Sequence, residues 1–131
     1  MVDTVALLVR ELLANPGVSA VLGDRVYGGS FPEDAAPPFA VVRGVSHSLT
    51  APPSMEWWDS TVTIDIHSND PIESISVATK AAVHAASLED VYPEGAVASV
   101  RLRDILSIED GAFTPTRSRN IVTVAITARN N

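Results

Sequence analysis

Residues 59–70, which read DSTVTIDIHSND, place three aspartates and one of the chain's three histidines in one short segment. The acids are Asp59, Asp65 and Asp70, and the histidine is His67. Carboxylate and imidazole groups bind Zn²⁺ and exchange protons in general acid–base catalysis. The segment is therefore the first place in this chain to look for a metal site or a catalytic pair.

The hydrophobic pattern of the same segment indicates how these side chains are arranged. Apolar and polar residues alternate strictly, which is the period of a half-buried strand whose inward residues are Val62, Ile64 and Ile66. Asp65 and His67 then point away from the core and lie about 6 to 7 Å apart along the strand. They supply at most two metal ligands, and no pattern places His47 or His84 beside them. The segment predicts a solvated strand face and no metal site.

Acid–base catalysis is disfavoured for a related reason. A catalytic pair needs a desolvated pocket that shifts its pKa values, and no pocket signature accompanies Asp65 and His67, which a surface ion pair explains. The chain lacks GxSxG, HExxH, GxxxxGK[ST] and a GxGxxG that follows a strand and opens a helix. It has no cysteine, which excludes thiolate zinc sites and thiol nucleophiles. We therefore predict that the protein is not an enzyme and holds no metal or cofactor.

The charged residues allow two interpretations. A net charge of −7 disfavours sequence-independent binding to nucleic-acid phosphates. Four arginines nevertheless fall in the last third of the chain, where they form either a basic patch or cross-strand pairs with Asp65, Asp104 or Glu109. These arginines are Arg101, Arg103, Arg117 and Arg119.

Two adjacent tryptophans follow a segment, residues 46–56, that reads as a long hairpin loop because Pro52 and Pro53 interrupt it. Neighbouring residues on a strand face opposite sides, so Trp58 is predicted to face the core and Trp57 to face outward. Trp57 is then either a contact with a partner subunit or local cover for the hairpin. Leu49, Met55 and Phe113 are further candidates for such a contact.

The remaining elements follow from periodicity and capping. Residues 3–14 predict an amphipathic helix, residues 18–23 a helical turn and residues 39–46 a strand. Asp70, Pro71 and Glu73 open a second helix, with Ile72, Ile75, Ala78, Ala82, Ala85 and Leu88 predicted on its buried face. A strand over residues 98–110 is predicted to turn one face inward, formed by Ala98, Val100, Leu102, Leu106 and Ile108. Residues 120–130 predict the last strand.

These elements predict one α+β domain over residues 1–131: a mainly antiparallel sheet with two principal helices packed on one face. The chain is 46% apolar, so it can bury a core without disulfides or metal. No apolar run approaches the roughly 18 residues needed to span a bilayer, and the N-terminus lacks the features of a signal peptide, so we expect a soluble protein. The helix-free face is predicted to be polar and to include Thr61, Thr63, Asp65 and His67.

The order of these segments resembles the tail terminator, or tail completion, family of long-tailed bacteriophages. The similarity covers nearly the whole chain and rests on the turn LGDRVYGG, the strand entry PPFAVVRGVSHS, and the strand TVTIDIHSND followed by a helix. It implies a non-enzymatic virion protein of the tail or neck, assembled in the host cytoplasm. The implied partners are further copies of itself in a hexameric ring, the major tail protein of the tube and a head–tail connector protein.

In this family a ring stops tube polymerisation and offers a joining surface to the head, and an acidic lumen would let DNA pass without sequence-specific binding. The candidate subunit or tube interface comprises Leu49, Met55, Trp57, Arg101, Arg103, Phe113, Arg117 and Arg119. Two alternatives remain open at this stage. One is a head-side connector or stopper, and the other is a small enzyme or metal-binding domain built on Asp65 and His67.

Overall fold

The computed structural model describes residues 1–49 and 56–131. The chain forms three helices and six strands among these residues. The helices are α1 (Thr4–Ala14), α2 (Pro16–Leu22) and α3 (Pro71–Ala86). The strands are β1 (Val26–Gly28), β2 (Phe39–Leu49), β3 (Trp57–Ser68), β4 (Val91–Tyr92), β5 (Gly95–Asp110) and β6 (Arg117–Arg129).

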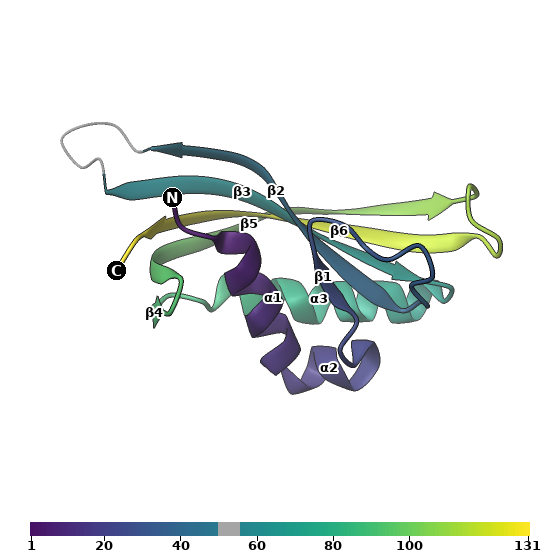
Figure 1. Ribbon diagram of the computed structural model, residues 1–131. Helices are drawn as coiled ribbons and strands as arrows, with labels where there is room; N and C mark the ends of the chain where they lie inside the picture. The colour runs from purple at the N-terminus through teal and green to yellow at the C-terminus, as the bar shows by residue number, and fades with distance from the viewer. Residues whose placement is uncertain (50–55) are drawn as a thin grey trace.

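The strands form one sheet in the order β1-β2-β3-β6-β5-β4, in which only the β1–β2 pair is parallel. All three helices lie on the same side of this sheet, and the β2–β3 and β5–β6 hairpins point toward opposite ends of it (Figure 1). α3 packs against β3, β5 and β6, and α1 packs against β1 and β2. The α+β prediction with a mainly antiparallel sheet is confirmed, and α2 adds a short third helix between the two principal ones. We call the helix-free side of the sheet the open face.

The helix starts follow the predicted capping chemistry. Oδ1 of Asp70 accepts a hydrogen bond of 2.9 Å from the backbone N–H of Ile72, with Pro71 at the first helical position. Asp3 caps α1 in the same way through the N–H of Ala6, and Asn15 caps α2 through the N–H of Val18. No single helix in residues 1–49 and 56–131 is long and apolar enough to cross a membrane; α1 and α2 would suffice only together, and they meet at 85°.

The buried face predicted for the second helix is confirmed for Ala78, Ala82, Ala85 and Leu88 and is wrong for Ile72 and Ile75. The residues that face the sheet are Ser74, Val77, Ala78, Ala81, Ala82 and Ala85, whereas Ile72 and Ile75 are exposed. A buried hydrogen-bond chain fixes this rotation, because Oγ of Ser74 accepts from Nδ2 of Asn120 at 2.7 Å and donates to the carbonyl of Ser118. Leaving these groups unpaired would cost more than exposing an isoleucine. Small side chains then let the helix approach the sheet closely.

The faces of β5 also differ from the prediction, because the strand contains two irregularities in its pairing with β6. One lies between Val97 and Ser99 and the other between Leu102 and Asp104. Each extra residue reverses the side to which the following residues point. Val100 and Leu102 face the helices as predicted, but Leu106 and Ile108 pair with Ile121 and Arg119 and so lie on the open face.

The predicted loop over residues 46–56 is shorter than expected. β2 continues to Leu49 after an irregularity between Gly44 and Ser46, and it pairs with β3 as far as Trp58. The predicted contact Met55 lies outside the described residues. β2 is therefore longer than the strand predicted over residues 39–46.

Gly95, the first residue of β5, lies where the backbone of β6 approaches β5 too closely to admit a side chain. A Cβ at this position would lie 2.4 Å from the carbonyl oxygen of Arg129 and 3.1 Å from a methyl of Val2. We expect Gly95→Ala to lower the free energy of unfolding by about 2 kcal/mol, because the backbone of β6 must move to admit the methyl group. Gly111→Ala is the control, since nothing lies within 4 Å of that position. Equal losses for both variants in urea unfolding would contradict the steric argument.

Candidate functional site

Asp65 and His67 point away from the helices, as predicted, but they are not on a solvated surface. Their side chains are 1% and 2% exposed. They lie on the open face, close to the turn that connects β5 to β6. The exposure predicted for this part of the open face is therefore wrong. Thr61 and Thr63, on the same strand and face, are half-buried.

Aromatic rings from outside β3 cover this part of the open face. The ring of Phe39 stacks on that of His67 with centroids 4.5 Å apart, Phe31 lies at 5.2 Å and Phe113 lies edge-on at 6.0 Å. The guanidinium of Arg117 lies over Phe113 and Phe39, at 3.9 and 5.2 Å from the ring centroids. We call Phe31, Phe39 and Phe113 the aromatic cover. It forms a second, small hydrophobic cluster on the side of the sheet that the helices leave open.

Asp65 is the centre of a group of charges beneath this cover. Its Oδ2 lies 2.5 Å from Nη2 of Arg119 and 3.3 Å from Nη1 of Arg43, and Oδ1 accepts a further bond from Nε of Arg119. Nε2 of His67 is 3.2 Å from Oδ2, at an angle outside the range of a regular hydrogen bond. Arg119 also binds Asp110 at 3.0 Å. We call Arg43, Asp65, His67, Asp110 and Arg119 the charge cluster.

The electrostatics of the charge cluster suit a structural role. Burial alone would raise the pKa of Asp65, but His67 and Arg119 outweigh it and lower that pKa to about 2. The carboxylate is thus ionised at neutral pH and occupied by fixed donors, so it has no proton to give. The cluster ties β2, β3, β5 and β6 together. Among residues 1–49 and 56–131, no group of three histidine or acidic side chains converges as metal ligands would.

The shift in the pKa of Asp65 predicts a pH dependence of stability. A folded-state pKa of about 2, against an ordinary value of 3.8, means that the carboxylate stabilises the fold above about pH 4. This contribution, about 2 kcal/mol, is lost as the pH falls from about 4 to 2. Urea unfolding of the wild type and Asp65→Asn should show a difference that shrinks across this window. A difference that stays constant from pH 5 to pH 2 would contradict the assignment.

The four arginines do not form one patch. Arg119 pairs with Asp65, as the cross-strand alternative predicted, and Arg117 packs on the aromatic cover. Arg101 and Arg103 are exposed, and they line a separate polar hollow of the open face with Ser46, Ser48 and Asp59. Arg101 pairs with Ala125 of β6, which is six residues, or about 20 Å, from Arg119.

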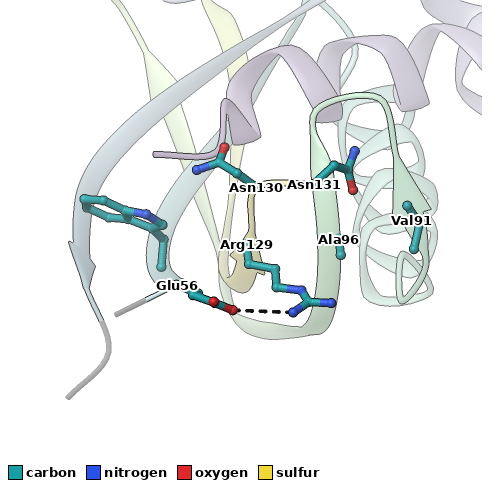
Figure 2. Close-up of a pocket in the computed structure, with 7 residues that line it drawn as sticks. Glu56, Val91, Ala96, Arg129, Asn130 and Asn131 are labelled. Atoms are coloured by element: carbon teal, nitrogen blue, oxygen red, sulfur yellow. Dashed lines mark ion pairs between the residues drawn. The ribbon is translucent and has the colours of Figure 1, made fainter. Parts of the chain in front are cut away.

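The two tryptophans lie at the opposite end of the sheet from the charge cluster. Trp57 is half-buried, and the guanidinium of Arg129 lies 5.2 Å from its ring. Trp58 is half-buried beside a shallow hollow of about 510 Å³ that is also lined by Val91 and Ala96. Figure 2 shows Glu56 and Arg129 across this hollow, joined by an ion pair of 3.5 Å. Exposed polar groups of this kind indicate no catalytic chemistry.

Exposed apolar side chains on two strands are the feature that the sequence did not single out. Val45 is 62% exposed and Leu49 40% on β2, and Leu102 is 46% and Leu106 56% exposed on β5. Of these, only Leu49 was predicted as a contact. The pattern of β5 concealed Leu102 and Leu106, because regular alternation assigned both to the core. Large apolar side chains on strands at a sheet margin are typical of surfaces that meet another protein.

Comparison with known proteins gives one family. The family profile described as "Tail completion protein gp17" matches residues 6–125. A solved structure titled "Virion of native gene transfer agent (GTA) particle" contains a chain that is similar in fold. The TM-score is 0.71 and the identity 14%, over 96% of this chain and 98% of that one. A search of curated proteins finds no match.

Proposed function

Because the chain belongs to the tail completion protein gp17 family, we propose that it is a tail terminator, which forms a ring on the end of a phage tail tube. In this position it stops tube polymerisation and provides the surface to which the head joins. The family match over residues 6–125 is the observation that carries the proposal. The resemblance drawn from the sequence is thereby confirmed.

Family membership settles the broader class of function. The protein is a structural component of a phage tail, and the prediction that it is not an enzyme is confirmed by this membership. The chain of similar fold comes from a gene transfer agent virion, which supports a place in the tail or neck of a virion. Assembly in the host cytoplasm and direct contact with the major tail protein and a head–tail connector are part of the proposal.

Three features of the structure support a ring. A closed ring needs two different surfaces on each copy that fit each other, and the exposed residues of β2 and β5 lie at opposite margins of the sheet. The ion pairs of the charge cluster join β2, β3, β6 and β5 between these margins. A net charge of −7 suits a channel through which DNA passes without sticking.

The test is the mass of the purified protein by light scattering, alone and mixed with the major tail protein. We expect a particle of about six subunits of 13.9 kDa, either free or only on the ends of tail tubes. A strict monomer that ignores tail tubes would overturn the proposal. Binding to portal-bearing heads in place of tubes would instead identify a head-side connector or stopper.

A further inference from the structure

The outer edge of β5 is open along most of its length. β4 pairs only with Gly95 and Ala96, so no strand in the described part of the chain pairs with this edge beyond Val97. Residues 104–110 pair regularly with β6, and they contain no proline, lysine or arginine. Natural sheets protect open edges with bulges, prolines or charged side chains, lysine most often. Residues 97–103 carry two irregularities and two arginines, whereas residues 105–108 are uncharged and regularly paired, with the acids Asp104, Glu109 and Asp110 only at the two ends of the stretch.

The opposite margin of the sheet has a second open edge. β1 pairs only with residues 40–42 of β2, and among the described residues no strand covers the outer edge of residues 46–49. These four residues pair regularly with β3 and include the exposed Leu49. We call residues 104–110 the β5 edge and residues 46–49 the β2 edge.

We propose that the β5 edge of one copy pairs with the β2 edge of the next copy, so that the sheet continues from subunit to subunit around the ring. This inference rests on the proposed ring and names the surfaces that close it. The directions of the strands agree with it, because β2, β3, β6 and β5 are each antiparallel to the next. In a ring whose axis runs roughly along the strands, β2 of the neighbouring copy is therefore antiparallel to β5. Main-chain hydrogen bonds then satisfy both open edges.

The positions of the two edges fit the geometry of a closed barrel. The β2 edge pairs with residues 58–61 of β3, which in turn pair with residues 125–128 of β6. Residues 105–108 of β5 pair with residues 119–122 of β6. The difference of six residues is about 20 Å along the strands. The four long strands of one copy span about 19 Å. Together these lengths correspond to a strand tilt of about 45°, within the range of closed barrels.

The side chains of the two edges are complementary in this register. Pairing Leu49 with Ile105 places two apolar side chains together on the helix side, and Ser48 then lies opposite Leu106 on the open face. The β5 edge carries Asp104 and Glu109, both exposed, whereas the β2 edge has no acid and carries His47. Like charges are therefore not brought together across the pairing.

A disulfide test exploits the absence of cysteine from the chain. The double variant Ser48→Cys, Leu106→Cys places its thiols within disulfide distance only between copies, because β3 and β6 separate the two positions by at least about 14 Å within one copy. The control is Ser48→Cys, Ser99→Cys, because Ser48 and Ser99 are both level with Thr127 of β6 and would face each other if the sheets met without tilt. Both variants are assembled reduced, sized by light scattering, oxidised and run on a non-reducing gel.

We expect a ladder of cross-linked species up to about six subunits for the Leu106 pair and only monomer for the Ser99 pair. Particles of the expected mass that give no ladder would overturn the edge pairing and leave the terminator proposal standing. A ladder for the Ser99 pair alone would overturn the tilted register. If the wild-type protein forms no particle, alone or on tube ends, the proposed function fails and this inference fails with it.

Discussion

Asp65→Asn is expected to lower the free energy of unfolding by about 3 kcal/mol, although it changes one oxygen to a nitrogen. The buried carboxylate balances the charges of Arg43 and Arg119, and a neutral amide balances neither of them. The loss falls at the lower end of the range for a broken buried ion pair. Arg43 and Arg119 keep 39% and 23% of their side-chain surface exposed, so water can partly replace Asp65.

Asp59→Asn is the matched control, because Asp59 lies on the same strand and the same face but is exposed. Within residues 1–49 and 56–131, its carboxylate accepts one side-chain hydrogen bond, from the hydroxyl of Thr127, which an amide oxygen can also accept. We expect a change of less than about 0.5 kcal/mol in urea unfolding. Similar losses at both positions would mean that the charge cluster contributes no more than an ordinary surface acid.

Leu106→Glu is expected to weaken ring assembly and leave the folded monomer intact. The side chain is 56% exposed in a single copy, so a glutamate is tolerated there. In the proposed ring it would be covered by the neighbour's β2, which makes an added charge costly. It would also join the acids Asp104 and Glu109. We expect the concentration at which rings dissociate to rise more than tenfold, measured by light scattering over a dilution series.

Val83→Glu is the control for this variant. Val83 is 68% exposed on the outer side of α3, remote from both strand edges, so the substitution adds the same charge at a comparably exposed apolar position. It should leave both the mass of the particles and the unfolding temperature unchanged. Intact rings with Leu106→Glu would contradict an interface at the sheet edges. Disrupted rings with Val83→Glu would indicate an interface at the helix layer.

The sequence by itself determined the elements that depend on local chemistry. The strict alternation around Ile64 fixed β3 and the direction in which Asp65 and His67 point. The order Asp70, Pro71, Glu73 fixed the start of α3, because a side-chain cap and a proline at the first position act within one turn. The family could also be predicted, since its short motifs follow one another over nearly the whole chain.

Only the tertiary structure decided what surrounds these residues. Asp65 and His67 are buried because Phe31 and Phe113, distant in the chain, fold over the open face, and no pattern within β3 encodes that cover. The rotation of α3 depends on a hydrogen bond from Asn120, 46 residues away from Ser74. The irregularities in β5 moved Leu106 from the predicted core to the open face, because one extra residue reverses a strand whose period is two. In a strand without irregularities, such as β3, local periodicity determines which residues share a face, whereas burial depends on segments that reach that face from elsewhere in the chain.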